Sequence, residues 1–129
     1  MACTSLLRAA ASVALACAGA WAHAQPYPAQ PIRLIVPWPP GGGVDTSARI
    51  IAQPLSQRLG QNIVIENRPG AGGNIGTEQA ARAKPDGYTL LMGSVSPNAI
   101  NIHLYPKLPF EPLRDFEPIG YVTPVPPAR

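Results

Sequence analysis

Cysteine and histidine are scarce in this chain. Its cysteines, Cys3 and Cys17, both lie within residues 1–24, and its only histidines are His23 and His103. If residues 1–24 are removed as a leader, the remaining chain has no disulfide, no thiolate nucleophile and no cysteine ligand for a metal. A lone histidine without carboxylates at metal-ligand spacing is typical of a surface or packing residue, so we predict neither a metal site nor an enzyme.

Charge of one sign and long apolar runs are also lacking. The chain has 10 Lys and Arg against 7 Asp and Glu, a formal net charge of +3, and no cluster of basic residues. That balance excludes a nucleic-acid partner, which would require a basic patch. A membrane-spanning helix needs about 20 consecutive apolar residues, and no segment after the leader is that long and apolar. We therefore expect no direct membrane insertion once the leader is removed.

The N-terminus has the pattern of an export signal. A short basic start precedes a small, apolar stretch, and Ala22-His23-Ala24 fits the A-x-A cleavage rule. We predict a signal peptide over residues 1–24, which leaves residues 25–129 as the mature chain. Two alternatives stay open: a buried N-terminal helix, which would need a polar face, and a lipoprotein modified at Cys17, for which Ala14 stands where leucine is expected.

Proline is abundant, with 17 residues in the chain, well above an average usage of about 5%. The prolines fall mostly between periodic segments, so we interpret them as stiff loops within one domain. Apolar runs predict strands over residues 32–36, 63–67, 88–92 and 118–123. Apolar stripes at helical spacing predict helices over residues 44–59, 75–83 and 99–105. Gly60 suits the end of the first helix, and Pro54 inside it lies off the apolar stripe, on the expected solvent side.

The order of these elements predicts an α/β fold. A β-α-β-α-β order with short connections favours a parallel sheet with right-handed crossovers. Ligands of such sheets lie outside the carboxyl ends of the strands. Three loops emerge at that edge, over residues 37–43, 68–74 and 93–98. Two are rich in glycine and the third carries hydroxyl and amide groups, so we expect a binding site there.

The first of these loops predicts an anion site made of backbone. Gly41, Gly42 and Gly43 stand between a strand and a helix, so successive N–H groups and the positive helix end would face a ligand. A tight turn without a ligand is the alternative. No Lys-Ser or Lys-Thr follows, so the loop is not a P-loop. Asp45 either caps the first helical turn or accepts from a ligand, and Trp38 is either a pocket wall or a core anchor.

The other two loops have more general patterns. Residues 70–76 place glycines as G-x-G-x-x-x-G, one residue too long for a dinucleotide fingerprint, and Arg68 fits a structural ion pair better than a ligand clamp. Ser94, Ser96 and Asn98 offer groups that bind a carboxylate, directly or through water, or else only cap the loop. The serines lack the G-x-S-x-G pattern of a nucleophile elbow.

Four motifs, in order, carry a resemblance to a known family. They are YPAQPIRLIVPWPPGG at residues 27–42, ENRPGAGGNIG at 66–76, PDGYTL at 85–90 and LPFEPLRDF at 108–116. Together they cover roughly residues 27–124. The chain resembles the Bug family, the extracytoplasmic solute receptors of tripartite tricarboxylate transporters.

The resemblance implies a periplasmic, two-lobed α/β binding protein of the type II-like fold that closes on a small carboxylate. Residues 25–129 would form part of the first lobe, with the second lobe absent. The implied partners are two membrane components of the transporter, and no cofactor is implied. In the family the loops at 37–43 and 93–98 hold the carboxylate, partly through water. The predicted site residues are Trp38, Pro40, Gly41, Gly42, Gly43, Val44, Asp45, Ser94, Ser96 and Asn98.

Other readings of the chain stay open. Family members are much longer, so a non-functional truncated product without ligand binding is one alternative, and a small secreted enzyme acting on carboxylates is another. The third loop has serine or valine where the family usually has threonine, and Pro97 is not typical. The ligand is therefore expected only as a class, a di- or tricarboxylate or a related organic acid.

Overall fold

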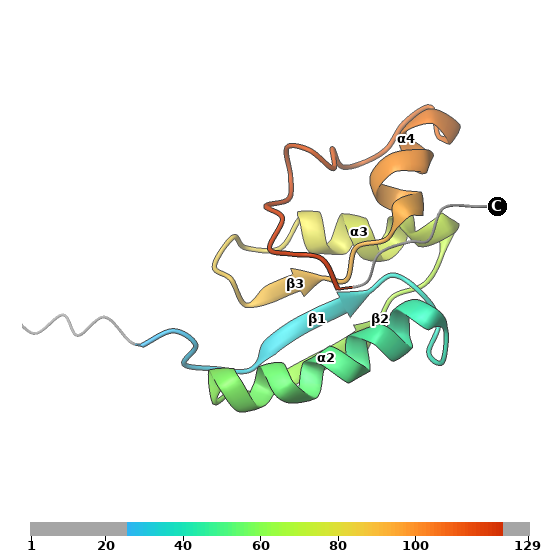
Figure 1. Ribbon diagram of the computed structural model, residues 1–129. Coiled ribbons are helices and arrows are strands. Elements are labelled where there is room, and N and C mark those ends of the chain that lie inside the picture. Colours follow the sequence, from blue (N-terminus) through green and yellow to red (C-terminus); the bar gives the residue numbers. More distant parts are fainter. Residues whose placement is uncertain (1–25, 123–129) are drawn as a thin grey trace, which may run out of the picture.

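The structure, a computed structural model, describes residues 26–122, so the predicted signal peptide at 1–24 lies outside the described residues. Three parallel strands form a sheet in the order β2-β1-β3, with β1 at Ile32–Val36, β2 at Ile63–Asn67 and β3 at Thr89–Leu91. Helix α2 (Gly43–Leu59) joins β1 to β2, and helix α3 (Asn74–Ala81) precedes β3 (Figure 1). The predicted α/β order with a parallel sheet is confirmed.

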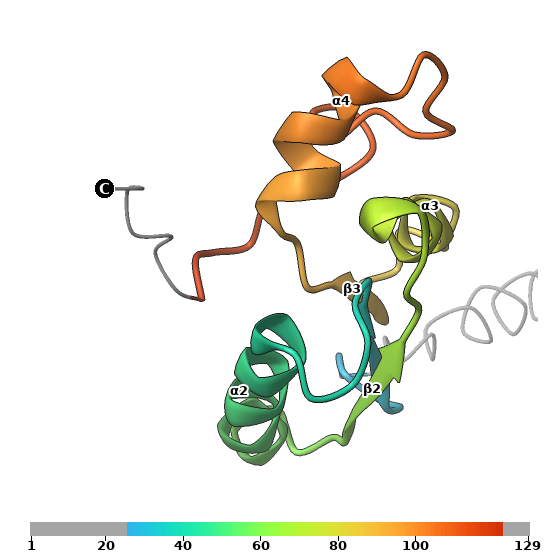
Figure 2. The same ribbon diagram turned by 90° about the vertical axis from the view of Figure 1, so that its right-hand side faces the viewer.

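Helices cover both faces of this sheet. α2 packs against β1 and β2, and α3 packs against β1 and β3 on the other face (Figures 1 and 2). The central strand β1 is therefore buried, with Ile32, Ile35 and Val36 fully excluded from solvent. Arg33 is its one charged residue, and it pairs with Glu66 of β2 at 2.8 Å. Covering on both faces explains why the rest of this strand is apolar.

Helix α2 buries the stripe that the sequence predicts. Ala48 and Ala52 are buried. The main core cluster between α2 and the sheet consists of Leu34, Val36, Ala48 and Met92. The helix ends before Gly60, whose φ of 66° is the left-handed conformation that glycine adopts without steric cost. Pro54 lies inside the helix and is exposed, on the solvent side as expected.

The loop after β3 is shorter than the predicted 93–98. The chain is already helical at η3 (Ser96–Ile100) and continues into helix α4 (Asn101–Leu104). Pro97 stands in the first turn of η3, where a proline loses no helical hydrogen bond. The buried side-chain amide of Asn101 donates to the turn at the start of α3, which fixes this helical segment in place.

The predicted strand at residues 118–123 is wrong over the described residues 118–122, which form no strand. Pro118 has no N–H to donate to a sheet. Ile119 and Tyr121 are 83% and 101% exposed, so the segment buries no apolar face as a strand of this sheet would. Thr123 lies outside the described residues.

The remaining elements are found with small shifts. α3 ends two residues before the predicted 75–83 does, and β3 is one residue shorter at each end than the predicted 88–92. Such shifts are ordinary because helix and strand ends fray. Within residues 26–122, none of the helices is long and apolar enough to cross a lipid bilayer.

Candidate functional site

The first turn of α2 has backbone donors that no side chain caps. Gly42, the residue before the helix, has an extended backbone and no capping hydrogen bond is made to the turn. The N–H groups of Gly43 and Val44 have no acceptor within the helix, because the carbonyls four residues earlier lie outside it. The helix dipole adds about half a positive charge at the same end. This turn can therefore bind an anion.

The side chain of Asp45 holds the turn from inside the protein. Asp45 is 1% exposed. Its Oδ2 accepts from the main-chain N–H of Gly41 at 2.8 Å and from Arg49 Nε at 2.9 Å, and its Oδ1 accepts from Asn67 Nδ2 at 2.9 Å. The carboxylate is thus buried and bonded, and it presents no open negative charge to an anion. This geometry favours the structural one of the two roles predicted for Asp45.

Acid should weaken this network. The hydrogen bond from Arg49, followed by those from Gly41 and Asn67, holds the pKa of the Asp45 carboxyl well below its usual value. The unfolded chain takes up this proton near pH 3.9. The ionised carboxylate therefore stabilises the fold above about pH 4, and that contribution is lost as the pH falls towards the lower native pKa.

We expect the free energy of unfolding of Asp45→Asn to vary less between about pH 5 and pH 2 than that of the parent chain. The substitution removes the titrating group but keeps a side chain of the same shape. Urea unfolding at a series of pH values measures the difference. The same pH dependence in both proteins would contradict the role given to this carboxylate.

Trp38 connects the loop after β1 with the end of β3. Its indole Nε1 donates to Ser94 Oγ at 2.9 Å, and its main-chain carbonyl accepts from Asn67 Nδ2 at 3.0 Å. The half-buried ring also packs against the core cluster. Because β1 and β3 are parallel neighbours, their carboxyl ends bring these two loops together. Of its two predicted roles, the geometry favours the core anchor: Trp38 does not line the hollow described next, but it bonds to Ser94, which does.

A hollow of about 780 Å³ lies at this carboxyl edge of the sheet, which faces the viewer in Figure 2. Its volume suits a small molecule. The wall is made by the first turns of α2, the end of β3 with the loop after it, and the last described segment. The lining residues are Gly43, Val44, Ser47, Leu91, Met92, Gly93, Ser94, Val95, Asn98, Gly120, Tyr121 and Val122.

The structure brings residues of two predicted loops to one wall. Among the predicted site residues, those that line the hollow are Gly43, Val44, Ser94 and Asn98. The other predicted residues do not line it. Trp38 bonds to Ser94, Asp45 is buried, Ser96 is half-buried in η3, and the exposed loop before α2 holds Pro40, Gly41 and Gly42.

Sequence reasoning missed several lining residues. Ser47 stands four residues after Gly43, so helical spacing places both on one face, and this signal was sufficient to find it. Residues 120–122 line the hollow because the chain returns to it after α4. No local sequence pattern predicts that return. The second glycine-rich loop, 68–74, does not line the hollow. Arg68 pairs with Glu66 at 3.3 Å, which confirms the predicted structural ion pair.

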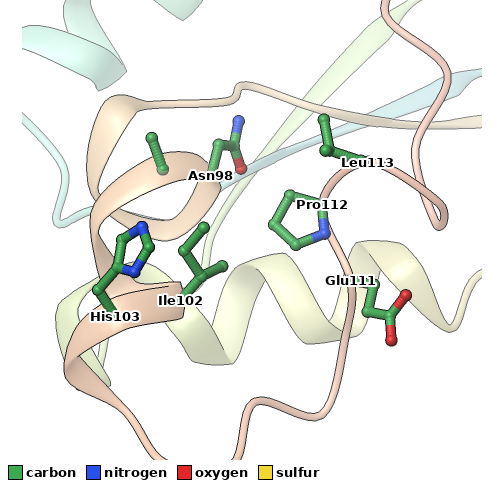
Figure 3. A pocket seen from close by; sticks show the side chains of 7 residues that line it. Asn98, Ile102, His103, Glu111, Pro112 and Leu113 are labelled. Carbon is green, nitrogen blue, oxygen red and sulfur yellow. The ribbon is translucent and has the colours of Figure 1, made fainter.

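A second hollow, of about 460 Å³, lies between the helical segment of η3 and α4 and the coil that follows. Figure 3 shows Ile102 and His103 on one side of it and Leu113 on the other. Its carboxylate, Glu111, pairs with Arg114 at 3.1 Å. Within the described residues, no group of three or more His, Cys, Asp or Glu is placed to hold a metal ion. This second hollow therefore offers mainly apolar surface.

Proteins of one family are similar to this chain. The family described as tripartite tricarboxylate transporter family receptor, TctC, matches residues 47–128. Protein BugT of Bordetella pertussis is 49% identical over 104 residues, which cover 80% of this chain and 32% of that protein. The chain thus spans about a third of the length of the relatives it matches.

Solved structures agree with this match. MatC from Rhodopseudomonas palustris with bound malate is 40% identical and has a TM-score of 0.67, over 70% of this chain and 31% of that one. An R. palustris protein with adipate is 38% identical with a TM-score of 0.65, over 67% and 29%. The family match covers more than half of the chain, and the resemblance of its motifs is confirmed. The chain belongs to the receptor family of the tripartite tricarboxylate transporters.

Proposed function

We propose that this chain provides the carboxylate-binding part of the first lobe of a periplasmic receptor, which delivers a small organic acid to the membrane components of a tripartite transporter. The observation that carries the proposal is the uncapped first turn of α2, which lines the same hollow as Ser94 and Asn98. The malate and adipate of the related structures, both dicarboxylates, support the ligand class. The predicted leader supports the periplasmic location.

The hollow has the donors that a carboxylate needs. One carboxylate oxygen would accept from the N–H groups of Gly43 and Val44, and the other from Ser94 Oγ or Asn98 Nδ2, directly or through water. Gly93 leaves room for the Asn98 amide, because a Cβ at Gly93 would lie 2.7 Å from Asn98 Nδ2. Hydrogen bonds to a charged acceptor contribute about 1.5–3 kcal/mol each. The apolar part of the wall would contact the carbon chain of the ligand.

Gly43→Pro tests the backbone donors directly. Proline removes the N–H of Gly43 but is favoured at the first position of a helix. Gly42 has a ψ of 167°, the extended conformation that a residue before proline prefers. We expect the helix to form as before and the affinity for malate or adipate to fall about 10-fold or more. Titration of the chain from residue 25, followed by calorimetry or NMR, measures the affinity.

Gly43→Ala is the matched control, since it keeps the N–H and a Cβ at this position meets nothing within 4 Å. Its affinity should fall less than that of Gly43→Pro, because the donor is kept. Equal affinities of Gly43→Pro and Gly43→Ala would show that this donor does not hold the ligand. A folded parent chain that binds neither acid nor a tricarboxylate would contradict the proposed function.

A further inference from the structure

Contacts of both the main chain and the side chain hold Trp38 in place. Its main-chain carbonyl accepts from Asn67, its Nε1 donates to Ser94 Oγ, and the ring packs on the core cluster. Gly73, ahead of α3, lies beside the ring, where a Cβ would be in ordinary van der Waals contact with Trp38 Cζ2 at 3.5 Å. The direction of the indole N–H is therefore set by the fold before any ligand arrives.

This fixed donor determines what the Ser94 hydroxyl offers. An indole N–H only donates, whereas a serine hydroxyl has one proton and two lone pairs. One lone pair of Ser94 is occupied by Trp38, and among the hydrogen bonds of residues 26–122 the Ser94 hydroxyl proton has no acceptor. A hydroxyl that accepts a hydrogen bond is also polarised into a stronger donor. Ser94 lines the hollow, so its proton is available to a ligand there.

We propose that Trp38 is a positioning residue that presents Ser94 as a donor, so that the site selects an ionised carboxylate over the neutral amide of the same acid. The inference rests on the proposed function. With the N–H groups of Gly43 and Val44 on the helix side and the Ser94 proton on the strand side, both flanks of the hollow donate. A carboxylate accepts on both oxygens, whereas an amide sets its own NH₂ against one of these donors.

Trp38→Phe tests the inference, because it keeps an aromatic ring and removes the indole N–H. Both lone pairs of Ser94 are then free, and its hydroxyl becomes a weaker donor and a better acceptor for an amide. We expect the affinity for adipate to fall about 5-fold while the affinity for adipamide, the diamide, is unchanged or rises. NMR titration of the chain from residue 25 with each compound gives the two affinities. In the parent chain the Trp38 indole N–H signal, the only one from residue 25 onward, reports on the site itself.

Two further variants separate positioning from general damage. Tyr88→Phe removes the hydroxyl that accepts from the main-chain N–H of Ala29 at 2.9 Å, near the start of β3 and away from the hollow, so both affinities should stay as in the parent. Ser94→Ala should weaken adipate binding, and adding Trp38→Phe to it should weaken binding no further. This non-additivity is expected if Trp38 acts only through Ser94.

Each other outcome has a distinct meaning. An equal loss of adipate and adipamide affinity in Trp38→Phe would show a merely structural role and overturn the inference. Unchanged affinities for both compounds would overturn it as well. If Gly43→Pro weakens adipate binding while Trp38→Phe preserves the selectivity, the proposed function stands and the inference fails. If the folded parent chain binds no carboxylate, both fail together.

Discussion

A single methyl group added at Gly76 is expected to lower the free energy of unfolding by about 2–3 kcal/mol. Gly76 is buried in α3, where the helix crosses the loop after β1. A Cβ there would lie 2.7 Å from the carbonyl oxygen of Arg68 and 2.9 Å from Cα of Pro37. These are main-chain atoms that cannot rotate away, so α3 would have to shift off the sheet. Urea unfolding of Gly76→Ala measures the loss.

Gly43→Ala is the control for this prediction too, since it changes the same residue type at a helical position with open space around it. Alanine is preferred over glycine in helices by about 0.5–1 kcal/mol, so the control should be as stable as the parent chain or slightly more stable. The same substitution, glycine to alanine, is therefore expected to lower the free energy of unfolding at position 76 and to leave it unchanged or raise it at position 43. If Gly76→Ala unfolds at the urea concentration of the parent, α3 does not pack closely on Pro37 and Arg68.

The sequence was informative where structure depends on neighbours along the chain. The apolar residues of β1 and the stripe of α2 follow from local periodicity, and Gly60 from the requirement for a left-handed helix end. Predictions from the sequence were wrong where the structure depends on contacts between residues far apart in the chain. The loop after β3 becomes helical early because Asn101 bonds to the turn before α3. A strand at residues 118–123 would have needed a neighbouring strand to pair with, and the local sequence pattern does not determine such pairing.

The candidate site divides in the same way. Topology predicts that the loops after β1 and β3 meet, and Gly43, Val44, Ser94 and Asn98 lie on one wall. Two long-range bonds organise that wall, from Asn67 to Trp38 and from Trp38 to Ser94, across 29 and 56 positions of the sequence. No spacing rule relates residues so far apart. The residues that could bind a ligand were thus predictable, whereas the residues that hold them in place were not.

Asp45→Ala is expected to lower the melting temperature by about 10 °C or more. The carboxylate accepts hydrogen bonds from Gly41, Arg49 and Asn67 and is almost completely excluded from solvent. Its removal deletes three hydrogen bonds to one charged acceptor, and hydrogen bonds to charged groups contribute about 1.5–3 kcal/mol each. The loop before α2 would loosen at the same time, because Gly41 is its anchor to the helix. Thermal unfolding followed by circular dichroism measures the change.

Asp86→Ala is the matched control. Its carboxylate also accepts a main-chain hydrogen bond, from Tyr88 N at 3.0 Å, but the residue is exposed, so water replaces the lost acceptor. We expect its melting temperature to fall by less than about 5 °C. Equal falls in the two variants would mean that burial of Asp45 adds nothing to its hydrogen bonds. A larger fall in Asp45→Ala, together with weaker carboxylate binding at temperatures where the variant is still folded, would show that this buried network also holds the donors of the α2 turn in place.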